Sequence, residues 1–290
     1  MKTTRTFLKW TALALSVAIP LTAAQAHRSW MLPSATILSG DDVWVTIDAA
    51  VSNDLFYFEH FPMRLANIGA PPEALGGRGG RPAELIITAP DGSRAEPKNG
   101  NIGRYRSTFD VQLTQKGTYK IAATNDGIFA SWKEGTETKR WRGTLAAFAK
   151  EVPANAQGLQ ATQLDSRLEV FVTSGKPTRD ALKLTGAGLE LDPVTHPNDL
   201  VAGSPATFRL VLDGKPAANL KVTVIPGGNR YRDKLGDMTL NTDADGKFTV
   251  TWPNAGMYWM EASVRDGATG TPNVKQRRAN YTATFEVLAP

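Results

Sequence analysis

The chain has no cysteine and only three histidines among its 290 residues. Without cysteine it can form neither disulfides nor thiolate metal sites. Any metal ion must therefore be held by nitrogen and oxygen ligands, which favours copper, zinc, nickel or cobalt over an iron–sulfur cluster. The three histidines, His27, His60 and His196, are the scarce side chains that could supply imidazole nitrogens.

Long apolar runs are missing beyond the first 26 residues. Residues 1–26 begin with three basic side chains, continue with an apolar stretch and end in Ala24-Gln25-Ala26, which is typical of a secretory signal peptide. We expect cleavage after Ala26 and export to the periplasm. The mature chain would then begin at His27 and contain no membrane span.

A large excess of charge of one sign is also absent. The formal net charge is +5, but three of the 33 basic residues belong to the predicted leader, which leaves 30 basic against 28 acidic residues. The basic residues are dispersed, and the short pairs Lys139-Arg140 and Arg277-Arg278 are interpreted as solvated faces. We therefore expect no nucleic-acid partner.

Helical periodicity is weak, with short candidates at residues 144–150 and 181–185. In the first half of the chain, alternating apolar and polar residues bounded by turn signals predict strands at 42–48, 83–89, 106–113 and 118–123. In the second half they predict strands at 189–191, 206–212, 219–225, 238–241, 247–252, 257–264 and 281–287. Residues 243–246 predict a turn, and the Gly- and Pro-rich residues 69–82 predict a surface loop near a binding site.

These patterns predict an all-β protein made of two β-sandwich domains. A boundary near Gly186 divides residues 27–185 from residues 186–290. About seven short strands within roughly 100 residues are typical of an immunoglobulin-like sandwich, so the C-terminal domain is assigned to that class.

The mature N-terminal residue carries two metal ligands at once. The α-amine and the imidazole of His27 can chelate one divalent ion, and His60, in an aromatic stretch, could add a third nitrogen. Three nitrogens in a T shape form a histidine brace, which suits copper(II). His196 could complete the site if the second domain packs over the first. Four nearby side chains are candidates for an oxygen ligand: Asp48, Asp54, Tyr57 and Glu59.

Each histidine also has an ordinary explanation. His27 can stand at the cleavage site by chance, His60 can be a half-buried substitute for an aromatic residue, and His196 can be a surface residue between Pro193 and Pro197. No G-x-S-x-G motif, cysteine nucleophile or dinucleotide-binding fingerprint is present, so we expect no enzymatic activity. The tryptophans are interpreted as core residues rather than as a sugar-binding platform.

The start of the mature chain resembles a known family. Residues 27–34 (HRSWMLPS) are similar to the A-H-x-x-W-[LMI]-x-P start of the DUF4198 family of exported bacterial proteins. The resemblance implies an exported protein, and some members are labelled as periplasmic components of nickel or cobalt uptake. A typical member has an acidic residue after the histidine, whereas this chain has Arg28, which removes one carboxylate ligand. Further similar segments lie at 52–62, 139–143, 148–153, 195–200 and 256–262.

Three functions remain open at this point. The first is a periplasmic divalent-metal-binding protein that holds copper or nickel and assists metal uptake, with a membrane transporter or outer-membrane receptor as partner. The second is a metal-free interaction module that docks a receptor, a glycan or a protein through its Gly/Pro loop and exposed tryptophans. The third is a copper oxidase, which needs an open coordination position and a flat aromatic surface that the sequence does not reveal.

Overall fold

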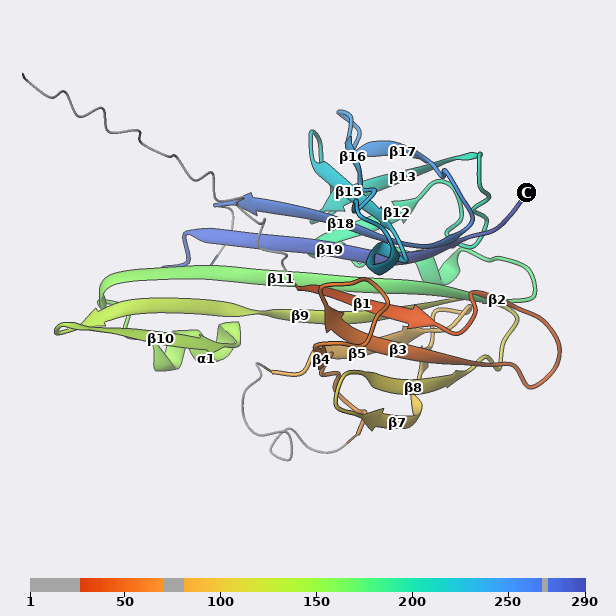
Figure 1. The fold of residues 1–290 in the computed structure, drawn as a ribbon. Helices are drawn as coiled ribbons and strands as arrows, with labels where there is room; N and C mark the ends of the chain where they lie inside the picture. The colour runs from red at the N-terminus through yellow and green to blue at the C-terminus, as the bar shows by residue number, and fades with distance from the viewer. Residues whose placement is uncertain (1–26, 70–80, 268–270) are drawn as a thin grey trace, which may run out of the picture.

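The computed structural model describes residues 27–69, 81–267 and 271–290. The predicted leader and most of the Gly/Pro-rich segment lie outside these residues. The described chain consists almost entirely of strands, with one short α-helix (Figure 1). The predicted all-β class with two β-sandwich domains is confirmed. No helix in the described residues has the length and apolarity needed to cross a membrane.

The first domain is a sandwich of two antiparallel sheets. One sheet has the order β1 (Arg28–Pro33), β3 (Trp44–Ser52), β8 (Ser107–Gln112) and β7 (Lys98–Ile102), with β4 (Phe61–Pro62) also on β3. The facing sheet contains β11 (Gln157–Ser174), β9 (Gly117–Glu134), β5 (Glu84–Thr88) and β6 (Arg94–Ala95). The short β2 (Ile37–Leu38) runs parallel to β11, and β10 (Glu137–Gly143) pairs with β9 before α1 (Leu145–Glu151).

The second domain has the immunoglobulin-like arrangement. The sheet of β12 (Leu189–Pro193), β13 (Pro205–Leu212), β14 (Lys215–Pro216) and β17 (Lys247–Thr251) faces the sheet of β16 (Met238–Asn241), β15 (Lys221–Pro226), β18 (Gly256–Asp266) and β19 (Gln276–Val287). Short 3-10 turns lie at Asp180–Leu182 and Asn229–Tyr231. The predicted boundary at Gly186 lies between β11 and β12.

Both domains contain a tyrosine corner, a hydrogen bond characteristic of immunoglobulin-like sandwiches. The hydroxyl of Tyr258, near the start of β18, donates to the carbonyl oxygen of Asn254 over 2.8 Å. In the first domain the hydroxyl of Tyr119, near the start of β9, accepts from the backbone N–H of Gln115 over 2.8 Å. In each case the bond fixes the loop before a central strand, so the two domains share this local feature.

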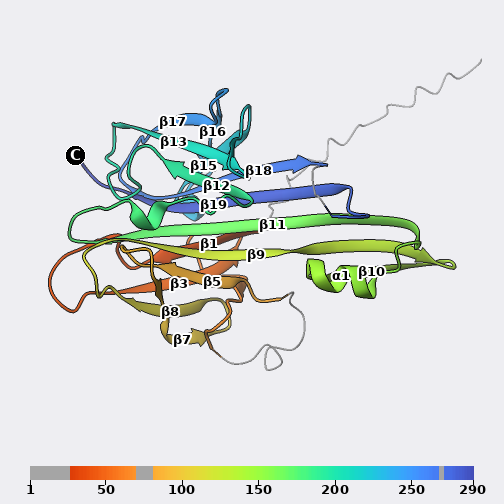
Figure 2. The ribbon, with the colours of Figure 1, turned by 180° about the vertical axis from the view of Figure 1, so that it is seen from behind.

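The two domains are joined through one continuous sheet. β11 pairs in parallel with β19 from Thr162 to Val170, which extends the first domain's sheet into the second. Because side chains alternate along a strand, β11 contributes to two cores. Leu168, Val170 and Val172 pack in the first core, whereas Phe171 packs in the second. β3 and β8 accordingly lie on one side of β11, and β12 and β13 lie on the other (Figures 1 and 2).

An aromatic cluster fixes β1 against the second domain. Trp30 on β1 and Trp259 on β18 are 0% and 2% exposed and pack together with Ile225 of β15. The indole N–H of Trp30 donates to Ser52 Oγ over 2.8 Å, and that of Trp259 donates to the carbonyl oxygen of Ser29 over 3.0 Å. These contacts place β1 over the shared sheet, with Trp30 three residues after His27.

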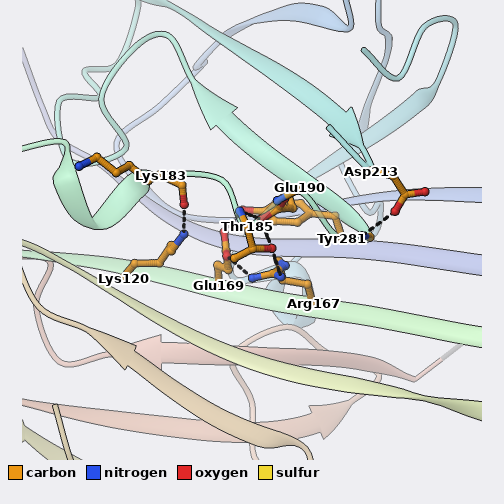
Figure 3. A network of polar contacts seen from close by, with 10 residues as sticks. Lys120, Arg167, Glu169, Lys183, Thr185, Glu190, Asp213 and Tyr281 are labelled. Carbon is orange, nitrogen blue, oxygen red and sulfur yellow. Dashed lines mark hydrogen bonds and ion pairs between the residues drawn. The ribbon is translucent and has the colours of Figure 1, made fainter. Parts of the chain in front are cut away.

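A buried polar network crosses the same junction (Figure 3). Glu169 on β11 and Glu190 on β12 are each 2% exposed, and Arg167 lies within ion-pair range of both, at 3.3 and 3.8 Å. The Tyr281 hydroxyl donates to Glu169 over 2.7 Å, and the backbone N–H of Thr185 donates to Glu190 over 2.8 Å. Burial raises the pKa of Tyr281 well above its ordinary value, so the phenol stays a neutral donor.

The Arg277-Arg278 pair corrects one prediction. Arg277 is 7% exposed and bridges Asp213 at 2.6 Å and Asp266 at 3.2 Å, so it is not part of a solvated face. Alternation along β19 turns Arg278 to the opposite, exposed side. Lys139 and Arg140 are exposed, as expected.

Candidate functional site

His27 and His60 lie in contact. Val51 of β3 pairs with Ser29 of β1 and with Phe61 of β4, which brings the residues preceding β1 and β4 together at the end of β3. The two imidazole rings are stacked, with centroids 3.9 Å apart and an interplanar angle of 23°. Both side chains are exposed. The structure therefore brings together two of the three histidines that the sequence singled out, although 32 residues separate them.

The segment between β3 and β4 is folded by its own acidic residues. One carboxylate oxygen of Glu59 accepts from the backbone N–H groups of Asn53 and Asp54, over 2.8 and 3.0 Å. The carboxylate of Asp54 accepts from Asn229 Nδ2 over 3.0 Å and ties the segment to the second domain. These bonds hold His60 at the start of β4, and they direct both carboxylates to backbone and amide partners.

The other expected oxygen ligands are also engaged elsewhere. Tyr57 packs against the Arg230 guanidinium, 3.9 Å from the ring centroid. Asp48 lies 3.3 Å from Arg106, and burial raises the pKa of its carboxyl group. No group of three or more His, Asp or Glu side chains in the described residues could hold a metal ion. The histidine pair accordingly has no acidic side chain as a third ligand there.

His196 lies in a different place. Its Nδ1 accepts from the backbone N–H of Asn198 over 3.1 Å, so the neutral ring carries its proton on Nε2. That nitrogen lies 3.0 Å from the carbonyl oxygen of Thr178 and 3.1 Å from Thr118 Oγ1. Burial lowers the pKa of His196 below its ordinary value. Both ring nitrogens thus have hydrogen-bond partners within the protein, at the junction between the two domains.

The expected convergence of three histidines is therefore corrected to two. Thr118, which contacts His196, pairs with Thr173 on β11, whereas the cavity beside His27 reaches Ser166 on the same strand. At about 3.3 Å per residue these positions lie roughly 20 Å apart. Packing of the second domain over the first buries His196 near the C-terminal end of β11, whereas the cavity beside His27 reaches the middle of that strand.

A cavity of about 870 Å³ opens beside His27. Its floor is the face of the shared sheet that also carries Leu168, with Ser166 of β11, Thr282 of β19 and Glu261 of β18. His27 and Phe61 contribute to its wall. The lining contains seven arginines: Arg28, Arg64, Arg81, Arg104, Arg142, Arg167 and Arg278.

The positive charge of this cavity is only partly balanced. Glu261 is the single acid among the described lining residues, and burial raises the pKa of its carboxyl group although Arg278 and Arg28 act in the opposite direction. Arg81 pairs with Asp126 over 2.8 Å, and Arg167 is held by the buried network. In the described parts of the chain, no carboxylate lies within 4.0 Å of four arginines: Arg28, Arg104, Arg142 and Arg278.

The sequence interpretation missed this basic cavity. Its seven arginines come from β1, β10, β11, β19 and the loops before β5 and β8, so no local sequence motif indicates the cavity. The interpretation of the tryptophans as core residues is confirmed for Trp252 and Trp259, which are 0% and 2% exposed. Trp132 and Trp141 are only half-buried, against α1.

The fold and site define a protein of two β-sandwich domains on a shared sheet, the C-terminal one immunoglobulin-like, with a histidine pair beside an arginine-lined cavity. The family model described as "Domain of unknown function (DUF4198)" matches residues 24–266, and the chain belongs to this family. The resemblance seen in the sequence is thereby confirmed.

No curated protein matches the chain. Among solved structures, the "D0-D1 domain of Intimin" is 15% identical, with 89% of this chain and 97% of that chain covered and a TM-score of 0.20. At that TM-score the likeness carries no argument about function.

Proposed function

We propose that this is a periplasmic divalent-metal-binding protein that uses the mature N-terminal His27 together with His60. The metal is copper or nickel, and the role is an accessory one in metal uptake or handling, beside a membrane transporter or an outer-membrane receptor. The observation that carries this proposal is the contact between the two imidazole rings, at 3.9 Å between centroids.

The donor set fits a late first-row metal. Removal of residues 1–26 would free the His27 α-amine and provide three nitrogen donors with the two imidazoles. Imidazole and amine nitrogens suit copper(II) and nickel(II), whereas calcium and magnesium require oxygen ligands. To bind one ion, the stacked rings must turn until a nitrogen of each converges on it. Both side chains are exposed, so this rotation meets little resistance from packing.

The surrounding structure supports a fixed position for His27. Trp30 and Trp259 anchor β1, and Arg28 donates to the carbonyl oxygen of Asn53 over 3.2 Å. The start of the mature chain is therefore attached to the segment that carries His60. A preorganised pair of ligands loses less entropy on binding than two independent side chains.

Equilibrium dialysis with metal analysis tests the proposal. The protein must be exported through its own leader and shown by mass to begin at His27. We expect one copper or nickel ion per chain, and a loss of affinity of more than about tenfold in His27→Ala and in His60→Ala. His196→Gln is the matched control, because it removes the remaining histidine roughly 20 Å away.

Unchanged affinity in His27→Ala would refute the N-terminal site. Equal losses in all three variants would indicate an effect on folding instead. If no stoichiometric metal binds to the correctly processed protein, the metal-free interaction module becomes the better hypothesis.

A further inference from the structure

The arginine-lined cavity has a charge pattern that the histidine pair does not explain. Arg28, Arg104, Arg142 and Arg278 place guanidinium groups at a cavity of about 870 Å³ in which Glu261 is the only described acid. This volume lies in the range of small-molecule sites. Four like charges at one hollow repel one another, so an anion that binds there relieves that repulsion.

The spread of these arginines indicates the shape of the anion. They come from four separate parts of the fold: β1, the loop before β8, β10 and β19. An anion with several carboxylate groups can present a separate charge to more than one of these guanidinium groups, whereas a phosphate carries its charge at one centre. Each planar guanidinium matches a carboxylate with two parallel hydrogen bonds.

The apolar side chains of the cavity wall further restrict the kind of anion that fits. Phe61, Val51 and Trp259 line the same cavity and present apolar surface beside the charges. The Arg28 guanidinium lies 5.7 Å from the Trp259 ring centroid, an arrangement that orients its charge without neutralising it. An organic skeleton with carboxylate groups fits both the apolar walls and the cationic ones.

We propose that this cavity binds a small organic polycarboxylate, held by Arg28, Arg104, Arg142 and Arg278 beside His27. The anion also supplies oxygen ligands for a metal ion held by the histidine pair, because no acidic side chain in the described residues forms a metal-binding group with the two histidines. The metal ion is therefore bound as a complex with the polycarboxylate, which forms either before the ion reaches the protein or in the cavity itself. This second step rests on the proposed function, whereas binding of the anion does not.

Isothermal titration of metal-free protein with citrate, in chelator-treated buffer at fixed ionic strength, tests the anion site. We expect saturable binding that Arg142→Gln and Arg278→Gln each weaken by about tenfold to a hundredfold. Glu261→Gln removes the opposing charge and should tighten binding. Arg94→Gln is the matched control, because it removes an exposed arginine on β6 that does not line the cavity.

The outcomes separate the two proposals. Absence of citrate binding, equal weakening in Arg94→Gln, or tighter binding of inorganic phosphate than of citrate would overturn the polycarboxylate site. Citrate binding that persists in His27→Ala, in protein that holds no metal, would support the cavity independently of the metal proposal, which the dialysis experiment tests separately. Unchanged urea midpoints in the arginine variants, whose side chains lie at the surface, verify that folding is intact.

Discussion

Replacement of Trp30 by alanine tests the role of the interdomain aromatic cluster. The Trp30 side chain is 0% exposed, packs with Trp259 and Ile225, and donates to Ser52 over 2.8 Å. Truncation of a buried tryptophan to alanine costs about 3–5 kcal/mol, from lost burial and from the cavity left behind. We expect a loss of that size in the free energy of unfolding.

Trp44→Ala is the matched control for this change. Trp44 is 40% exposed and its indole N–H bonds only to Asp42, over 2.9 Å. A surface substitution of this kind should cost below about 1 kcal/mol. Urea unfolding followed by far-ultraviolet circular dichroism measures both variants without relying on tryptophan fluorescence.

Similar losses in the free energy of unfolding of the two variants would contradict the conclusion that the aromatic cluster fixes β1. If the reasoning holds, Trp30→Ala, three residues from His27, also loosens the start of β1. Metal affinity should then fall in Trp30→Ala but stay unchanged in Trp44→Ala, in conditions where both proteins remain folded.

Three further predictions follow from local contacts. Tyr119→Phe and Tyr258→Phe each remove a tyrosine-corner hydrogen bond and should cost about 1 kcal/mol in chemical denaturation; no loss in either would contradict the corner. Gly246→Ala should destabilise more than Gly214→Ala, because both glycines have positive φ but only at Gly246 would a Cβ meet backbone atoms; the order of melting temperatures decides this. Burial lowers the pKa of His196, so as pH falls below the ordinary value of 6.5 the unfolded chain takes up a proton that the folded protein does not, and stability falls. His196→Gln should flatten this slope, by at most about 1.4 kcal/mol per pH unit, and an unchanged slope would contradict it.

Much of the second domain could be predicted from local pattern. The run from residue 206 to 212 and that from 247 to 252 alternate apolar and polar side chains, because one face of each strand is buried and the other is solvated. The turn at residues 243–246 was also predicted, and Asp243 Oδ1 accepts there from the backbone N–H groups of Asp245 and Lys247.

β11 escaped prediction for a physical reason. Its second half is buried on both faces, since Val170 and Phe171 enter different cores, so no alternation survives. Its first half is rich in polar residues and pairs antiparallel with β9. The sequence consequently predicted no strand between residues 123 and 189, where the structure has the strand that joins the domains.

The candidate site, too, could be predicted from the sequence only in part. His27 and His60 were predicted together because their rarity and the leader single them out, and the structure places them in contact. His196 shares their rarity, but its position depends on packing between domains that no local pattern records. The cavity depends on Arg28, Arg142 and Arg278, which meet only through the shared sheet and therefore leave no signal in the sequence.

The most direct test of the N-terminal metal site is copper(II) electron paramagnetic resonance on two forms of the protein. One form begins at His27, as verified by mass, and the other retains a methionine before His27 that blocks its amine. We predict a stoichiometric type 2 signal with nitrogen couplings in the first form and its loss in the second. Identical spectra from the two forms, or no stoichiometric copper in the first, would contradict the proposal.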